Sequence, residues 1–362
     1  VNPSTFIENL ETLPGTEVSP VDEEARHPVR IKIDEALMLG TVDPSVVQEE
    51  VATWLSLRLE SRDLSESKRS FRHEDQSEGI TFSPTRVERY LACPFKYFAG
   101  EELGLEEERE EFSRVSPLER GTWLHEILDE FYKAWQSDGR GAINDENIDL
   151  ALDRCAGVME KVLTTHKTAQ SLPQAERTLE RSLFLGSIAK RGLIDRVLRF
   201  DAEQGLAVVD RLLEHKLKGK FKFKSSSGTR SVSLHGKVDR IDLLPDQTFR
   251  VVDYKLGQAP NPKLAVQLPI YAVCSEQDLA DRPDGPWKVK DAYYLAFKKE
   301  GLAAPMVKKG ELEQALDDGQ QRFLDAVDGI SQQEFPVRPA EPFNCKYCGY
   351  STVCRKEYVE DS

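Results

Sequence analysis

The fold is decided by two neighbouring stretches, Gly-Lys-Val-Asp-Arg-Ile-Asp at residues 236–242 and Val-Val-Asp-Tyr-Lys at residues 251–255. Apolar residues recur with a period of about two in this region, which is typical of β-strands. Between the two stretches, Leu-Pro-Asp-Gln at 244–247 has the composition of a tight turn. The sequence therefore predicts two paired strands, at about 231–243 and 248–256, in the core of the protein.

Charged side chains interrupt these otherwise apolar strands. Residues two apart on a strand share a face, so Asp253 and Lys255 point the same way. Asp239, on the partner strand, can join them if the register allows. A salt-bridge ladder on a solvated face is one interpretation of this pattern. The other is a site for a divalent cation, because buried charges need partners or a metal and Mg²⁺ takes oxygen ligands.

The rest of the chain from about residue 81 alternates between helical and strand patterns. Ser83-Pro84 starts a helix that includes Phe95, and Ser116 to Glu119 forms a capping box before another helix. Further helices are predicted at about 145–168, 172–204, 262–274 and 311–330, and further strands at about 206–216 and 288–297. This order predicts an α/β fold with a central mixed sheet flanked by helices.

Residues 1–80 differ in composition and are predicted to be an acidic extension of a domain at 81–362. They carry 17 acidic and 8 basic residues, with a helix expected over 44–62 and a linker over 61–79. The chain begins with Val1, which fits a piece of a longer protein. It has no phosphate-binding loop, no signal peptide and no apolar run long enough to span a membrane, so we expect a cytoplasmic protein without a membrane partner.

Four motifs, in this order along the chain, resemble the RecB-like branch of the PD-(D/E)XK (restriction-endonuclease-like) nuclease superfamily. They are Gly-Thr-Trp-Leu-His at 121–125, the strand at 236–242, Asp-Tyr-Lys at 253–255 and Gln-Leu-Pro-Ile-Tyr at 267–271. The resemblance covers about residues 81–360 and implies the superfamily core and a metal-dependent DNA nuclease activity, with Mg²⁺ or Mn²⁺ as cofactor.

The resemblance also implies a role for each matching residue. The metal ligands would be His125, Asp239, Asp253 and the backbone carbonyl of Tyr254. Lys255 would act on the attacking water. Gln267 and Tyr271 would line the site and position the DNA strand. The implied catalytic residues are thus Asp239, Asp253, Lys255, Gln267 and Tyr271.

Three cysteines near the C-terminus, Cys345, Cys348 and Cys354, have metal-ligand spacing. Cys93 is the best candidate for a fourth ligand. On spacing alone a zinc site is as well supported as an iron–sulfur site. The arrangement is similar to the staple of AddB-type nucleases, which implies a structural [4Fe–4S] cluster joining the two ends of the domain. The other two cysteines are expected to be buried within helices: Cys155 and Cys274.

A run of five lysines alternates with mainly apolar residues and predicts one basic face of a strand. A solvated edge strand protected by lysine is one interpretation, and a track for DNA phosphates is the other. Glu214, just before this run, is a further acidic candidate near the metal. The lysines are Lys216, Lys218, Lys220, Lys222 and Lys224.

Together with the resemblance, these features predict a metal-dependent nuclease, expected to act as an exonuclease on single-stranded DNA or the unwound end of a duplex. The resemblance implies that it would work with a helicase domain or subunit in DNA repair and recombination. Three alternatives stay open at this point. The first is a catalytically inactive DNA-binding or scaffold module of a repair complex. The second is a CRISPR-associated RecB-like exonuclease, and the third is a zinc-stabilised protein–protein adaptor.

Overall fold

The computed structural model describes residues 80–107, 114–225, 228–298, 302–306, 311–346 and 348–354. The chain divides into two compact units, 1–70 and 71–362, and the described residues belong to the second. The helix predicted over 44–62 and the linker over 61–79 lie outside the described residues. The domain boundary near residue 80 stays a prediction.

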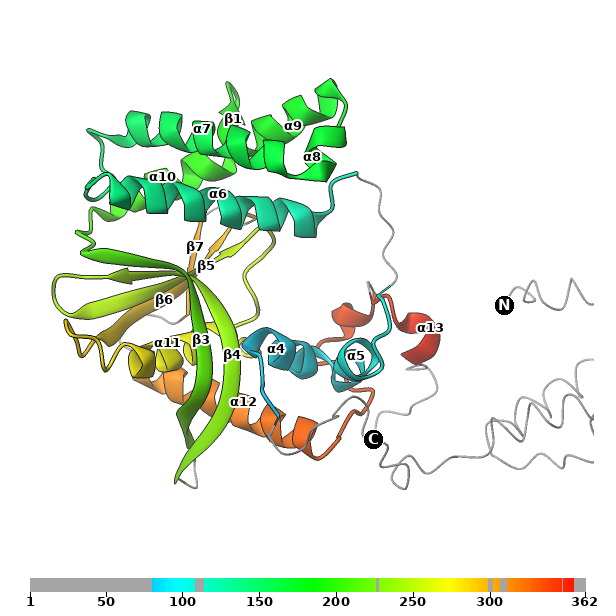
Figure 1. Ribbon diagram of the computed structural model, residues 1–362. Helices are drawn as coiled ribbons and strands as arrows, with labels where there is room; N and C mark the ends of the chain where they lie inside the picture. The colour runs from blue at the N-terminus through cyan, green and yellow to red at the C-terminus, as the bar shows by residue number, and fades with distance from the viewer. Residues whose placement is uncertain are drawn as a thin grey trace, which may run out of the picture. The chain divides into compact units, whose positions relative to one another are not determined.

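A five-stranded mixed sheet forms the centre of the described part. In spatial order its strands are β3 (Asp210–Ser225), β4 (Gly228–Leu243), β5 (Thr248–Lys255), β6 (Lys288–Ala296) and β7 (Ala303–Pro305). Only β5 and β6 run parallel, and the other neighbours are antiparallel. This sheet, with helices on its faces, confirms the predicted fold class (Figure 1). β7 was not predicted, since three residues are too few to show a period.

Helices cover both faces of the sheet (Figure 1). On one side lie α6 (Pro117–Ser137), α7 (Ile148–Thr165), α9 (Gln174–Leu185) and α10 (Leu193–Gln204), and on the other lie α11 (Gln267–Asp278) and α12 (Leu312–Ser331). β5 contributes to the apolar cluster on each side, Val251 to one and Val252 to the other. A strand buried on both faces is central, which places the Asp-Tyr-Lys motif inside the fold.

Smaller elements complete the described part. They are α4 (Pro84–Ala92), α5 (Pro94–Tyr97), a π-helical turn (Phe98–Glu102), α8 (Lys167–Ser171), β1 (Gly186–Ser187), β2 (Lys190–Arg191), a 3₁₀ turn (Pro342–Cys345) and α13 (Ser351–Cys354). α5 and α13 lie close together although they come from opposite ends of the domain (Figure 1). Among these described helices, none has the combination of length and apolar character that crossing a membrane requires.

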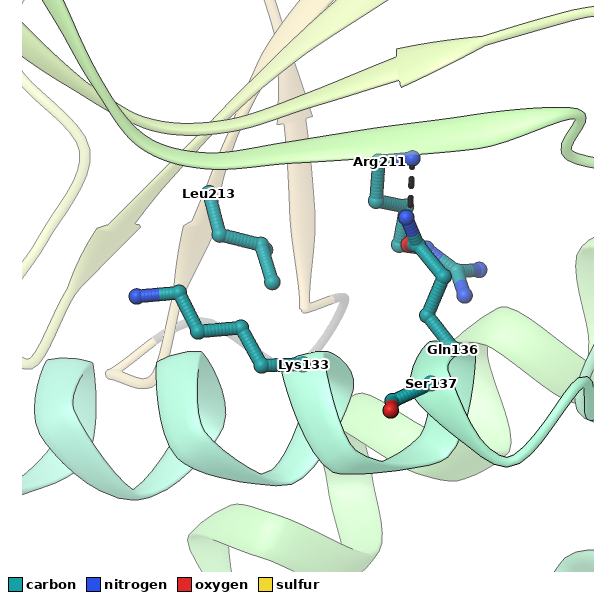
Figure 2. Close-up of a pocket in the computed structure, with 5 residues that line it drawn as sticks. All are labelled: Lys133, Gln136, Ser137, Arg211 and Leu213. Carbon is teal, nitrogen blue, oxygen red and sulfur yellow. Dashed lines mark hydrogen bonds between the residues drawn. The ribbon is translucent and has the colours of Figure 1, made fainter.

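The helix α6 is fixed at both ends. At its start the predicted capping box is confirmed, because Glu119 N–H donates to Ser116 Oγ at 3.2 Å and Ser116 N–H donates to Glu119 Oε2 at 2.9 Å. Near its end, the backbone N–H of Arg211 on β3 donates to Gln136 Oε1 at 3.2 Å, as Figure 2 shows. A cavity of about 370 Å³ lies here between α6 and β3. These contacts hold α6 across the sheet.

A buried ionic network locks α6 and α10 to the strands. The carboxylate of Asp242 accepts hydrogen bonds from Arg211 at 3.0 Å, Arg240 at 2.7 Å and Arg250 at 2.7 Å. Arg240 is fully buried and also pairs with Asp201 of α10 at 2.8 Å. Removing one charge from such a network strongly destabilises the fold, because the opposite charge is left buried and unpaired.

Three predicted helix limits were wrong. The helix expected over 172–204 is two helices, because the chain turns through β1 and β2, where Gly186 has a φ of 97° that a residue with a side chain rarely adopts. α11 begins at Gln267 instead of 262. α4 ends before Phe95, because Pro94 forces the preceding residue out of the helical region.

Strand lengths and caps differ in two places. β3 starts at Asp210 and continues to Ser225, beyond the predicted end at 216, so the lysine run belongs to this same strand. Ser83 occupies the predicted N-cap position of α4, yet its side chain makes no capping hydrogen bond. Proline at the first helical position supplies the remaining start signal.

Candidate metal centre

The centre forms where the alternation of inward-facing and outward-facing side chains is interrupted on both β3 and β4. On β4, Val238 and Ile241 lie in the same buried cluster although three positions separate them, so the two-residue alternation is broken between them. On β3, Glu214 has a φ of 49°, in the left-handed region. The neighbouring pairs keep one register, so Glu214 lies opposite Asp239 at this break. The break directs both carboxylates to one point.

His125 reaches this point from α6. Its Nδ1 atom lies 3.2 Å from Oδ1 of Asp239, and its Nε2 atom lies 3.2 Å from the carbonyl oxygen of Tyr254. Burial lowers the pKa of His125, but the carboxylates of Asp239 and Asp253 outweigh burial and raise this pKa to about 9. Without a cation, the imidazole is therefore protonated at neutral pH and pairs with Asp239.

The peptide group of Tyr254 joins β5 to the same centre. Its N–H donates to Oδ2 of Asp239 at 2.9 Å, while its carbonyl faces His125. The Tyr254 ring is buried in the apolar cluster to which α6 contributes. The carbonyl oxygen is therefore held in place by hydrogen bonding on one side and packing on the other.

Asp253 and Lys255 share a face of β5, as the strand period predicts. Lys255 Nζ lies 2.8 Å from Oδ2 of Asp253 and donates to Oε1 of Gln267 at 2.8 Å. Asp253 is 2% exposed. Burial, followed by the charge of Asp239, raises the pKa of Asp253 to about 7, although Lys255 opposes this rise. The aspartate is thus poised to exchange a proton for a cation near neutral pH.

Gln267 and Tyr271 lie one turn apart at the start of α11 and both face the strands. The Tyr271 ring packs on Gly236 of β4: a Cβ atom added to this glycine would lie 2.8 Å from Cε1 of the ring. Burial raises the pKa of Tyr271, and a hydrogen bond with Gln267 opposes the rise. The glycine at the start of the strand motif is therefore required by close packing against α11.

Glu214 belongs to the centre more closely than the sequence indicated. One ligand atom each from His125, Glu214 and Asp239 lies within 4.8 Å of the others, and this is the one such group among the described residues. The ammonium of Lys237, which lies two residues before Asp239 on β4, forms an ion pair with Glu214. The signal that could have identified Glu214 is its register with Asp239, which appears only when the strands are paired.

The donor set suits a hard divalent cation. It offers carboxylate oxygens, a backbone carbonyl and one imidazole nitrogen, the ligand types that Mg²⁺ and Mn²⁺ accept. The structure brings His125, Asp239 and the carbonyl of Tyr254 together, and Asp253 is close enough for its charge to raise the pKa of His125. It also places Lys255 beside them, within hydrogen-bonding distance of Asp253.

The cysteines fall into two groups. Cys155 and Cys274 are fully buried within α7 and α11, as expected. The other four are partly buried, and within the described ranges they do not form a group with all ligand atoms inside 4.8 Å. They are Cys93, Cys345, Cys348 and Cys354.

The segments that carry these four cysteines nevertheless pack together. The N–H of Ala340 donates to the carbonyl of Ala92 at 2.9 Å, next to Cys93. Further along, the Tyr350 hydroxyl donates to the carbonyl of Leu105 at 2.9 Å. The C-terminal segment is thus fastened to the segment that carries Cys93.

The lysine run lies along one exposed face of β3. Between the lysines, Leu217, Phe221 and Phe223 point into the core, which turns the five ammonium groups outward. On β4, His235 and Lys237 are exposed opposite Lys218 and Lys216 respectively. We call this surface the basic face: Lys216, Lys218, Lys220, Lys222, Lys224, His235 and Lys237. Because Lys237 forms an ion pair with Glu214, the basic face begins at the candidate metal centre.

Comparison with known proteins finds similar bacterial proteins. The relatives include proteins from three bacteria that are named as one subunit of an "ATP-dependent helicase/deoxyribonuclease". The one from Thermoanaerobacter sp. (strain X514) is 27% identical over 355 residues, covering 77% of this chain and 30% of that protein. Those from Clostridium perfringens (strain SM101) and Symbiobacterium thermophilum are 27% and 30% identical, covering 54% and 49% of this chain and 17% and 16% of theirs. This chain therefore spans less than a third of the length of these relatives.

A family model described as "PD-(D/E)XK nuclease superfamily" matches residues 81–355. The match includes α6, the paired strands, α11 and the cysteine-bearing segment, and so it covers every motif of the candidate site. The resemblance seen in the sequence is confirmed, and the chain belongs to the PD-(D/E)XK nuclease superfamily.

Proposed function

We propose that this chain is a Mg²⁺- or Mn²⁺-dependent deoxyribonuclease that hydrolyses phosphodiester bonds in single-stranded DNA or at unwound ends. The observation that carries this proposal is the convergence of His125, Asp239 and the Tyr254 carbonyl at one point, with Asp253 and Lys255 beside them. The set is complete, which favours a working nuclease over an inactive scaffold that keeps only the fold.

The cation would be held by His125, Asp239, Asp253 and the carbonyl oxygen of Tyr254, with Glu214 as a further oxygen donor. When bound, such a cation activates water and neutralises charge on the phosphate. The carboxylates of this group attract a positively charged ion. His125 gives up a proton when a cation arrives, since a ligating imidazole must be neutral.

Lys255 provides the fixed positive charge on the other side of the phosphate. Gln267 and Asp253 restrain its ammonium group, so it is already oriented before DNA binds. In this position it orients the attacking water and stabilises negative charge as it develops on the phosphate. Tyr271, packed on Gly236, forms the wall against which the DNA strand is positioned.

The basic face supplies the path by which DNA reaches the centre. Alternate residues on a strand are roughly 6.7 Å apart, so its lysines form an extended row of charge suited to a phosphate backbone. The net charge of the chain is −14, so a local basic surface is needed for DNA to approach. The contact between Lys237 and Glu214 connects this row to the metal centre.

The staple and the assembly are part of the same proposal. The four partly buried cysteines would hold a [4Fe–4S] cluster, with zinc as the alternative, and the packing of their two segments supports either metal. The relatives' names support a helicase domain or subunit as the partner and a role in DNA repair. Residues 81–362 would be the nuclease domain and 1–80 an extension.

The test is cleavage of end-labelled single-stranded DNA by the purified chain in Mg²⁺ or Mn²⁺. Asp253→Ala and Lys255→Ala should each abolish cleavage while circular dichroism shows an unchanged fold. Lys290→Ala is a matched control, because it removes another strand lysine paired with an aspartate, at 2.6 Å from Asp246. Equal cleavage by wild type and Lys255→Ala would refute the proposal.

A further inference from the structure

The first turn of α11 is capped by a side chain from a distant helix. Oε1 of Glu88, on α4, accepts hydrogen bonds from the backbone N–H groups of Val266 at 2.9 Å and Gln267 at 2.8 Å. The helix's own N-cap residue, Val266, makes no side-chain capping bond. Since the first amides of a helix have no partner within the helix, Glu88 fills a role that α11 cannot fill itself.

This cap lies next to the catalytic lysine. The residue whose N–H is capped, Gln267, uses its own side chain to accept a hydrogen bond from Lys255 at 2.8 Å. Helix α4 also contacts Tyr271, the second residue of α11 that faces the strands, because a hydrogen bond from Thr85 lowers the pKa of Tyr271. One turn of α4 therefore contacts both residues through which α11 faces the site.

The helix α4 is itself held firmly. The Tyr90 hydroxyl donates to the carbonyl of Glu334 at 2.8 Å, and its ring packs against Gly329 of α12. Before the helix, Phe82 pairs with β4 through two backbone hydrogen bonds of 2.9 Å, to Ser233 and from His235. Glu88 is thus presented from a rigid support, which a precisely placed functional group needs.

Partial burial also distinguishes Glu88 from an ordinary surface acid. Burial raises its pKa, whereas the amides of Gln267 and Val266 and the charge of Lys255 lower it. A buried carboxylate is costly unless its oxygens are satisfied, so its place in the fold depends on these amides.

We propose that Glu88 is a positioning residue of the nuclease site: by capping α11 from α4, it fixes Gln267 and, through it, the ammonium group of Lys255. This inference rests on the proposed nuclease function. It assigns a role to the helix that ends next to Cys93, because the staple segment and the catalytic lysine then share one support.

The experiment compares three substitutions at Glu88 in the full chain, with single-stranded DNA as substrate. Glu88→Gln keeps an acceptor oxygen at the same reach, and kcat should stay within about threefold of wild type. Glu88→Asp keeps the charge but withdraws the oxygens, and Glu88→Ala removes them. Both should lower kcat by about 10–100-fold, the range typical of groups that orient an active-site residue.

Two further readouts separate positioning from loss of structure. The KM for DNA and the affinity for Mn²⁺ should change less than about threefold in Glu88→Asp, because the proposed metal ligands lie on α6, β3, β4 and β5, outside α11. Glu101→Ala is the matched control: it removes the ion pairs of Arg86 and Arg89 on α4 without touching α11, and kcat should be unchanged.

Wild-type kcat in Glu88→Asp would overturn the inference, as would a Glu88→Gln variant slower than Glu88→Asp. An equal fall of kcat in Glu101→Ala would also overturn it, since the effect would then come from loosening α4. If the wild-type chain itself fails to cleave DNA, the proposed function fails instead, so the two failures are distinguishable.

Discussion

Oδ2 of Asp239 accepts a hydrogen bond from the backbone N–H of Tyr254 at 2.9 Å, while Oδ1 of the same carboxylate lies 3.2 Å from His125. A single side chain thus joins β4, β5 and α6. Loss of this carboxylate would remove one proposed metal ligand and the restraint on two others, which makes Asp239 the residue on which the geometry of the candidate centre depends most.

We therefore predict that Asp239→Asn lowers Mn²⁺ affinity and abolishes cleavage. The amide keeps the shape of the side chain but loses the charge that raises the pKa of His125. The imidazole should consequently titrate at lower pH, which NMR of the His125 ring protons would detect. An unchanged His125 pKa in this variant would show that Asp239 is not its main partner.

Metal affinity should depend on pH in a defined direction. In the metal-free protein the pKa of His125 is raised from 6.5 to about 9 and that of Asp253 from 3.8 to about 7. Both groups must lose a proton to bind a cation, so the Mn²⁺ affinity should rise at least about tenfold between about pH 6 and pH 8. Isothermal titration calorimetry in buffers of different ionisation enthalpy would report both the affinity and the released protons.

The same raised pKa affects the stability of the metal-free chain. Protonated His125 contributes stability that is fully present below pH 6.5, the unfolded value, and is lost as pH rises through about 9. The melting temperature of the metal-free wild type should therefore fall over this window more than that of His125→Ala. If the melting temperatures of the two proteins fall equally over this pH range, the stabilising role of protonated His125 is contradicted.

The contact between Gly236 and Tyr271 predicts a strong effect of one methyl group. Gly236→Ala should destabilise the fold by about 1–3 kcal/mol, the usual cost of overpacking, and should reduce cleavage. Thermal unfolding measures the first effect. Gly141→Ala is the control, because an added Cβ there meets nothing within 4 Å. Equal stability of the two variants would show that the ring has room to move.

The basic face predicts a change in the salt dependence of DNA binding. Replacing Lys218, Lys220 and Lys222 by Ala should weaken binding and reduce the slope of log affinity against log salt by about 2, since each phosphate contact on single strands contributes about 0.7. Three other exposed lysines serve as the control and should leave the slope unchanged: Lys161, Lys167 and Lys190. Equal slopes for the two triple variants would exclude the basic face as the DNA path.

The buried ionic network predicts a large loss of stability. Asp242→Ala leaves three arginines without their shared partner and should destabilise the fold by about 3–5 kcal/mol in chemical unfolding. The exposed Asp246→Ala should have little effect. A small effect of Asp242→Ala would mean that water or rearrangement compensates the arginines.

Much of this architecture was predictable from local patterns. The period of two around Asp239 and Asp253 correctly predicted paired strands, and the capping signal at Ser116 correctly predicted the start of the helix that carries His125. These features depend on residues close in sequence. The start of α11 was placed too early and the hairpin after Leu185 was missed. These two features depend on tertiary packing and on the backbone conformation of glycine, which the hydrophobic period does not report.

Two parts of the site could not be predicted for a physical reason. The break in alternation at Glu214 exists only because two strands bend together, so neither strand alone shows it. The cap joins Glu88 to Val266 and Gln267, which follow it in the chain by 178 and 179 positions. Nothing in the sequence near Gln267 indicates that α11 lacks a cap of its own. Both depend on contacts between distant segments.

The proposed function depends most on a cation bound at His125, beside the carboxylates of Asp239 and Asp253. Electron spin-echo spectroscopy of the Mn²⁺-loaded chain tests it most directly, because a ligating imidazole gives a nitrogen modulation. We predict this signal in the wild type and in His215→Ala, whose imidazole pairs with Asp278 instead, and its loss in His125→Ala. A wild type without nitrogen modulation, or a signal that survives in His125→Ala, would show that the cation does not bind at His125.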